Sequence, residues 1–186
     1  SPAGSTPAFF FINPAGVVFG AGATINVPGA FHVSTADYIK FANGDKFYAD
    51  PANGSTLSSA APEAFGFLGS NRAGITVKDG GRLETQGSQP ISIVAGDVEI
   101  DGGNVWTRGG DIRVVAIGRA AQEIGFTGAL PAASGELNLV NAGWIRSQSA
   151  GARDGGSIAV SAGNITIDSG YSYDYTGIFS LAYPDA

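Results

Sequence analysis

The sequence predicts an all-β fold: a right-handed parallel β-helix, or β-solenoid, with rungs of about 20 residues and a small extra-helical hairpin. Two observations predict it. Gly accounts for 29 of the 186 residues and charged residues for only 14%, and Gly costs about 1 kcal/mol in a helix interior. Short runs rich in Ile and Val also recur between turn signals. Their connections are too short for the crossovers of βαβ units.

The composition excludes several classes of function. The chain has no Cys, which excludes a disulfide framework and a zinc site built on thiolates. The net charge of −6 argues against nucleic-acid binding and against a polybasic membrane patch. No apolar run approaches the roughly 20 residues that span a bilayer, so no membrane insertion is expected. No basic region precedes Phe9, so any signal peptide is expected upstream of this chain.

The N-terminal part of the chain is predicted to form short, closely spaced strands. Apolar runs place them at residues 9–12, 17–19, 24–27 and 31–34. The first two flank a tight turn, in which Asn13 suits the first position and Pro14 the second. Gly16 can close this turn without steric conflict.

The next segment is predicted to leave the main body. Residues 38–49 form two short runs around the turn signal Ala42–Asp45, which predicts a β-hairpin. Residues 50–61 are rich in Ser, Pro, Asn and Gly and are predicted to be a loop. Residues 62–68 are apolar and are predicted to pack on the body as a strand or an irregular segment.

From residue 74 onward the sequence repeats. Successive unit starts lie 16, 21, 25 and 21 residues apart (91 − 75, 112 − 91, 137 − 112 and 158 − 137), and are Ile75, Ile91, Ile112, Leu137 and Ile158. The longest unit has room for an insertion at 119–134, in which residues 120–124 could form a turn of helix. The runs 95–103 and 162–170 align residue for residue, which is the strongest sign of repetition.

Side chains alternate along a strand, so the first and third residues of each unit start are predicted to face the core. These inward pairs are Ile75/Val77, Ile91/Ile93, Ile112/Val114, Leu137/Leu139 and Ile158/Val160. Each buried Ile or Val contributes about 1.5–3 kcal/mol. We therefore expect Ile93→Asp to be far more damaging than Ser92→Asp, because Ser92 is predicted to face outward.

Few residues offer catalytic chemistry. His32 is the only histidine, and we interpret it as an outward residue of a strand. Asp97, Glu99 and Asp101 alternate and would share a face with Arg113 one rung on. Clustered carboxylates with a basic residue are what a carbohydrate-active β-helix enzyme would need, although a solvated polar face is the simpler interpretation. No metal site or cofactor-binding motif is predicted.

Aromatic residues near the C-terminal end are candidates for carbohydrate binding. Tyr171, Tyr173 and Tyr175 alternate, so the three rings would share one face. Trp106 and Trp144 could contribute to a carbohydrate-stacking surface, although aromatic residues at such places more often cover a solenoid core. A carbohydrate-binding module is therefore an alternative function.

The first strands and their turn resemble part of a known family. Residues 12–20 (Ile-Asn-Pro-Ala-Gly-Val-Val-Phe-Gly), followed by 23–27 and 31–36, are similar to the filamentous-haemagglutinin-type secretion domain of two-partner secretion (TPS). The resemblance implies that residues 1–73 are the later part of such a domain. Residues 74–186 would then be β-helix rungs, and the repeated runs 95–103 and 162–170 resemble the rungs that follow the secretion domain in cyanobacterial members.

The resemblance also implies a function. Asn13, Pro14, Ala15 and Gly16 would form a secretion motif that an outer-membrane TPS transporter recognises during export. The protein would be secreted or lie on the surface of a Gram-negative-type bacterium, as a non-catalytic, adhesin- or haemagglutinin-like scaffold without a cofactor. Its expected partners are the transporter and a glycan or a host or cell-surface receptor. A polysaccharide lyase- or hydrolase-like β-helix enzyme remains the alternative, beside the carbohydrate-binding module.

Overall fold

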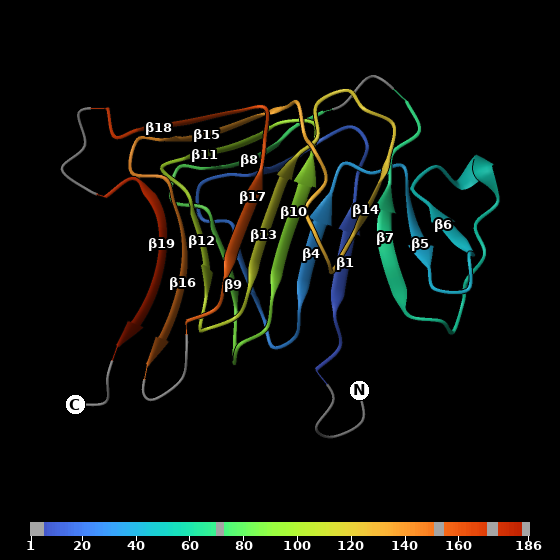
Figure 1. Ribbon diagram of the computed structural model, residues 1–186, viewed down its shortest axis with the longest axis horizontal. Coiled ribbons are helices and arrows are strands. Elements are labelled where there is room, and N and C mark those ends of the chain that lie inside the picture. Colours follow the sequence, from blue (N-terminus) through green and yellow to red (C-terminus); the bar gives the residue numbers. More distant parts are fainter. Residues whose placement is uncertain (1–5, 70–72, 151–154, 171–174, 184–186) are drawn as a thin grey trace.

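The chain winds through three parallel β-sheets (Figure 1). The structure, a computed structural model, describes residues 6–69, 73–150, 155–170 and 175–183. Sheet A consists of β1 (Phe9–Ile12), β4 (Phe31–Ser34), β10 (Ile91–Ala95), β13 (Ile112–Ala116) and β17 (Ile158–Ser161). Sheet B consists of β2 (Val17–Phe19), β8 (Ile75–Lys78), β11 (Val98–Asp101), β15 (Glu136–Val140) and β18 (Asn164–Asp168). Sheet C consists of β3 (Thr24–Val27), β9 (Arg82–Thr85), β12 (Asn104–Thr107), β16 (Trp144–Ala150) and β19 (Gly177–Tyr183).

The order of the strands defines a repeating path. The chain crosses sheet A, then sheet B, then sheet C, and then begins the next rung. Each strand of these sheets pairs in parallel with the equivalent strand of the neighbouring rung. The predicted all-β fold with parallel strands is therefore confirmed, and its arrangement is consistent with a β-solenoid.

The strand registers correct the predicted starts of the repeat. Ile91, Ile112 and Ile158 lie in register in sheet A, whereas Ile75 and Leu137 lie in sheet B. The prediction that these five positions are equivalent is wrong, because the same apolar–polar–apolar pattern occurs on more than one side of a rung. Within sheet A, the paired residues Ile91 and Ile112 are 21 residues apart (112 − 91).

The two runs that align in the sequence do occupy equivalent positions. Val98 and Ile165 both pair with Leu137, so the runs 95–103 and 162–170 cross sheet B two rungs apart. Their exposure differs, because β18 lies at the edge of sheet B. Ile165 is 47% exposed, whereas Val98 is buried.

The interior of the solenoid is one apolar core. The predicted inward pairs of four strands are almost completely buried, which confirms their direction, and are Ile75/Val77, Ile91/Ile93, Ile112/Val114 and Leu137/Leu139. Ile158 and Val160 pack against the same core but are only partly buried, because β17 lies at the edge of sheet A.

Two insertions leave the solenoid at the same corner, between sheets A and B. The first, residues 35–73, follows β4, and the second, residues 117–135, follows β13. Figure 1 shows their strands beside β1 and β4. They form the antiparallel sheet D, in the order β14 (Glu123–Gly125), β7 (Pro62–Gly66), β5 (Tyr38–Phe41) and β6 (Lys46–Tyr48).

Most of the secondary structure that the sequence predicts for these two insertions is present in sheet D. β5 and β6 form the hairpin predicted over residues 38–49, and the short 3-10 helix η1 (Pro51–Asn53) follows it. Residues 62–68 contain the strand β7. The predicted turn of helix at 120–124 is wrong, since Glu123–Gly125 forms β14. The reason is that β7 offers a partner strand, which the local sequence of β14 cannot reveal.

A second apolar core joins the insertions to the outer face of sheet A. Its buried members are Ala36, Ile39, Phe65, Phe67, Val94, Val115, Ile117 and Ile124. Polar contacts also link the two insertions, because Tyr38 Oη and Lys40 Nζ donate hydrogen bonds of 2.8 and 2.7 Å to the Glu123 carboxylate. The bonds from Lys40 and Tyr38 lower the pKa of Glu123.

His32 of β4 faces away from the solenoid core but is buried beneath the second insertion. Its exposed fraction is 7%, because the rings of Phe10 and Phe126 lie against the imidazole, with centroids 4.6 and 4.9 Å away. His32 Nδ1 lies 3.0 Å from Ser92 Oγ, and Ser92 is 3% exposed. The outward direction of His32 is as expected. Ser92 faces outward as predicted, but it is buried, because the second insertion covers this part of sheet A.

We expect His32 to make the stability of the fold depend on pH. Burial lowers the pKa of His32 from 6.5 to about 4, because the imidazolium ion would lose its hydration. The unfolded chain therefore binds a proton at a higher pH than the folded chain. This group leaves the free energy of unfolding unchanged above about pH 7 and lowers it as the pH falls from about 6.5 towards 4. The expected loss at pH 4.5 is roughly 2.5 kcal/mol.

Urea unfolding at pH 7 and pH 4.5 measures this loss. The matched variant is His32→Phe, which keeps an aromatic ring between Phe10 and Phe126 but cannot titrate. The variant should lack the part of the pH dependence that His32 contributes. An equal loss of unfolding free energy in both proteins would contradict the assignment.

Candidate functional site

The turn from Asn13 to Gly16 is closed by its own residues. The Gly16 N–H donates to the Asn13 carbonyl oxygen at 3.0 Å, with Pro14 and Ala15 between them. The Asn13 side chain strengthens the turn, since its Oδ1 accepts from the Ala15 N–H at 3.1 Å and its Nδ2 donates to the Gly16 carbonyl oxygen at 2.9 Å. Gly16 has φ of 105°, a conformation that favours glycine. The four predicted motif residues therefore form one β-turn with an Asx-type side chain.

This turn joins β1 to β2 at the corner between sheets A and B. The Asn13 N–H donates to the Ser34 carbonyl oxygen at 3.0 Å, and the Val17 N–H donates to the Gly74 carbonyl oxygen at 3.2 Å. Both ends of the turn are thus fixed to the next rung. The side chains of Pro14 and Ala15 are exposed. The turn is therefore rigid at its base and accessible at its tip.

The carboxylates that the sequence offers as a catalytic cluster do not meet Arg113. Glu99 and Asp101 belong to β11 of sheet B and Asp97 directly precedes this strand, whereas Arg113 lies on β13 of sheet A. Arg113 instead donates to the carbonyl oxygens of Gly128 and Ala129, at 2.9 and 3.2 Å, in the second insertion. The expectation that these four side chains share a face is wrong.

Two of these carboxylates hold neighbouring rungs together. Asp97 Oδ1 accepts from the Glu136 N–H at 2.8 Å, and Asp101 Oδ1 accepts from Asn141 Nδ2 at 2.7 Å. Among the residues that the structure describes, no group of three or more His, Cys, Asp or Glu side chains is placed to hold a metal ion.

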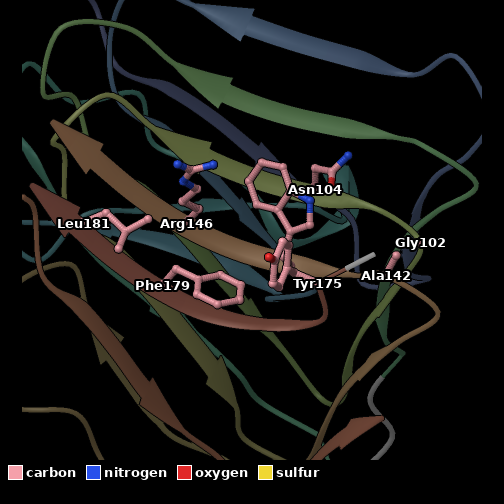
Figure 2. Close-up of a pocket in the computed structure, with 8 residues that line it drawn as sticks. Gly102, Asn104, Ala142, Arg146, Tyr175, Phe179 and Leu181 are labelled. Atoms are coloured by element: carbon pink, nitrogen blue, oxygen red, sulfur yellow. The ribbon is translucent and has the colours of Figure 1, made fainter. Parts of the chain in front are cut away.

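The tyrosine candidates are only partly covered by the structure. Tyr171 and Tyr173 lie outside the described residues, and Tyr175 is 84% exposed. Tyr175 lines an open groove of about 660 Å³ on sheet C, together with Trp144, Arg146 and Phe179 (Figure 2). Sequence reasoning named Trp144 but missed Arg146 and Phe179. Trp144 and Arg146 are two residues apart on one strand, and this spacing could have shown that their side chains lie on the same face of the sheet.

Comparison with known families shows which family the chain belongs to. A model of the TPS secretion domain matches residues 3–143, which is most of the chain. The chain belongs to the TPS secretion-domain family. No curated protein and no solved structure matches it in the corresponding comparisons.

Membership of the TPS family defines the general function. Proteins with this domain are secreted by Gram-negative bacteria and interact with an outer-membrane transporter during export. The TPS secretion domain is a non-enzymatic family. The described residues contain no helix that could span a bilayer.

Proposed function

We infer that this chain is part of a large exoprotein of the adhesin or haemagglutinin type, released from the cell or retained on its surface. The observation that carries the inference is the TPS match over residues 3–143, on parallel sheets that continue the same path to residue 183. The scaffold is a right-handed parallel β-helix with rungs of about 20 residues. The handedness is the one that parallel crossovers adopt in nearly all folds.

Folding outside the cell supplies a driving force for export in this proposal. Each strand of sheets A, B and C hydrogen-bonds to the equivalent strand of the neighbouring rung, so a folded rung is a template for the next. Each Ile or Val that becomes buried outside stabilises the exported part by about 1.5–3 kcal/mol. The chain then cannot slide back without losing this free energy, and export proceeds without ATP.

The Asn13–Gly16 turn is the element that the transporter recognises in this proposal. All three hydrogen bonds within the turn are local, so the turn can form in an extended chain before any rung exists. Pro14 reduces the conformations of the unfolded segment further. The transporter would therefore meet a preformed turn whose tip, Pro14 and Ala15, is accessible.

Asn13→Ala is expected to lower the secreted fraction of the protein, expressed from its complete gene, by about tenfold. The variant loses two side-chain hydrogen bonds of the turn, each contributing about 0.5–1.5 kcal/mol, and about 1.4 kcal/mol corresponds to a factor of ten. Immunoblots of medium and cells measure the secreted fraction.

Asn43→Ala is the matched control. Asn43 Oδ1 accepts from the Asp45 N–H at 3.2 Å in the turn between β5 and β6, so this Asn also supports a local turn. The control should be secreted normally. Unchanged secretion of Asn13→Ala, or an equal decrease for both variants, would contradict the recognition role.

The proposed exoprotein segment is non-catalytic. In support, the side chains that suggested a carbohydrate-active enzyme form hydrogen bonds to other parts of the fold, as Asp97 does to Glu136 and Arg113 to Gly128.

The division of the chain into a secretion segment, 1–73, and scaffold rungs, 74–186, stays a prediction. The three sheets and the family match both extend across residue 73. The cyanobacterial origin also stays a prediction.

A further inference from the structure

The outer face of sheet C contains a groove that the export function does not use. Its volume is about 660 Å³, and its walls include an amide, a guanidinium and three aromatic rings, those of Asn104, Arg146, Trp144, Tyr175 and Phe179 (Figure 2). The groove lies over β12, β16 and β19, in three successive rungs. Aromatic walls with a few convergent polar groups are typical of small-molecule and carbohydrate sites.

The strand registers explain how these side chains come together. Trp106, Arg146 and Phe179 are directly paired residues on β12, β16 and β19, so the guanidinium of Arg146 stands in a row between two aromatic positions. In the adjacent row, Trp144 pairs with Gly177, which has no side chain. A Cβ at Gly177 would lie 3.1 Å from Phe179 Cζ, so the Phe179 ring occupies the space over this glycine and borders the groove together with the indole of Trp144.

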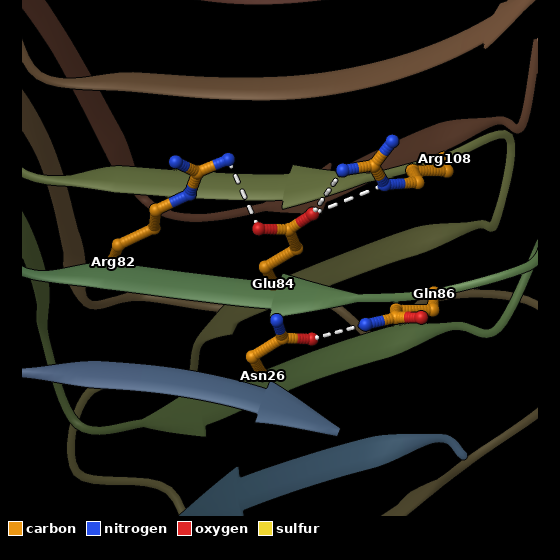
Figure 3. Close-up of polar contacts among 5 residues, drawn as sticks. All are labelled: Asn26, Arg82, Glu84, Gln86 and Arg108. Carbon is orange, nitrogen blue, oxygen red and sulfur yellow. Dashed lines mark hydrogen bonds and ion pairs between the residues drawn. The ribbon is translucent and has the colours of Figure 1, made fainter. Parts of the chain in front are cut away.

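Positive charge extends from the groove along the same face. Arg82, Arg108 and Arg146 lie on or directly after strands of three successive rungs, β9, β12 and β16. Glu84 holds two of them, since its carboxylate oxygens lie 2.9 Å from Arg82 Nη2 and 3.0 Å from Arg108 Nη2 (Figure 3). Both guanidinium groups lie 4.7 Å from the Trp106 ring centroid.

The charge of this face is opposite to that of the whole chain. On the described strands of sheet C, Glu84 is the single acidic residue, against Arg82 and Arg146, and Arg108 directly follows β12. The chain as a whole has a net charge of −6. A ligand with negative charge is therefore favoured on this face and disfavoured over most of the remaining surface.

We propose that the groove on sheet C binds an acidic polysaccharide that carries uronate groups. The apolar face of a sugar ring packs on Tyr175, Trp144 or Phe179, and a carboxylate pairs with the guanidinium of Arg146, which can form a bidentate bond. The amide of Asn104 can donate to or accept from a sugar hydroxyl. The polysaccharide lies across the strands, so that further uronates approach Arg108 and Arg82 in the neighbouring rungs, about 4.8 Å apart.

Isothermal titration calorimetry of the folded 186-residue chain tests this proposal with three probes. Polygalacturonate oligosaccharides carry both sugar rings and carboxylates, neutral galactan oligosaccharides carry only the rings, and polyglutamate carries only the carboxylates. We expect saturable binding of polygalacturonate alone, weakening as the salt concentration rises. No binding of polygalacturonate, or equal binding of either other probe, would overturn the proposal.

Two groove variants and two controls locate the site. Tyr175→Ala and Arg146→Gln are each expected to weaken binding of polygalacturonate about tenfold. Phe47→Ala and Arg119→Gln remove an exposed aromatic ring and an exposed guanidinium outside the groove, and should not change the affinity. Equal weakening by the controls, or unchanged affinity in both groove variants, would place the site elsewhere. The assay uses folded protein and no transporter, so its result does not depend on the proposed export.

Discussion

Leu139→Asp should prevent the solenoid from folding. Leu139 lies on β15, in register between Ile100 of β11 and Ile167 of β18, and its side chain is completely buried. An aspartate carboxylate at this position would lie in the apolar core without a partner. Burying an unpaired charge costs several kcal/mol, so we expect a loss of more than about 5 kcal/mol, comparable to the whole stability of a typical domain.

Asn138→Asp, one residue earlier on the same strand, is the matched control. Asn138 points outward and is only half-buried, between Glu99 and Thr166. Its loss should stay below about 1 kcal/mol, from repulsion by the Glu99 carboxylate. Circular dichroism and urea unfolding compare the two variants. A folded Leu139→Asp with a stability close to that of Asn138→Asp would contradict the inward direction of Leu139.

Gly103→Ala should have the second-largest effect, with a loss of about 3 kcal/mol or more. Gly103 is buried at the corner between sheets B and C, and a Cβ there would overlap the backbone carbonyl of Val77 in the preceding rung. The Gly103 carbonyl oxygen also accepts from the Trp144 N–H at 3.1 Å. The methyl group would therefore have to push two rungs apart. Gly143 approaches the carbonyl of Ile100 in the same way.

Gly20→Ala separates this steric effect from the general effect of replacing a glycine. A Cβ at Gly20 would meet nothing within 4 Å, and the Gly20 φ is not in the positive range. This substitution should be neutral or stabilise the fold by up to about 1 kcal/mol, because it restricts the unfolded chain. Thermal unfolding measures the melting temperatures of Gly103→Ala and Gly20→Ala. Equal melting temperatures for the two variants would contradict the close stacking of rungs at Gly103.

The class of fold could be predicted because its signals are local. Alternating apolar residues show which side chains face inward, as at Ile93 and Leu139. The turn at Asn13 has the residue types that its hydrogen bonds require. The register could not be predicted equally well, since Ile75 and Ile91 start similar patterns on two different sides of a rung.

Features that depend on distant residues were missed. The pairing of β14 with β7 joins two insertions, so neither sequence alone indicates it. For the same reason the sequence could not show that Phe126 covers His32 and that Ser92 is buried. The groove on sheet C combines Trp144, Arg146 and Phe179 of two neighbouring rungs, and this combination is known only once the register is known. Each of these features thus depends on contacts between residues that are far apart in the sequence.

Secretion of this protein should depend on its partner transporter, because the chain belongs to the TPS family. The protein, expressed from its complete gene, would be quantified in the medium and on the surface of cells with the transporter, without it, and with the transporter gene restored on a plasmid. Membership of the TPS family predicts that the extracellular and surface protein falls to background without the transporter and returns on restoration. Equal amounts outside the cell in the presence and absence of the transporter would contradict export of this protein by two-partner secretion.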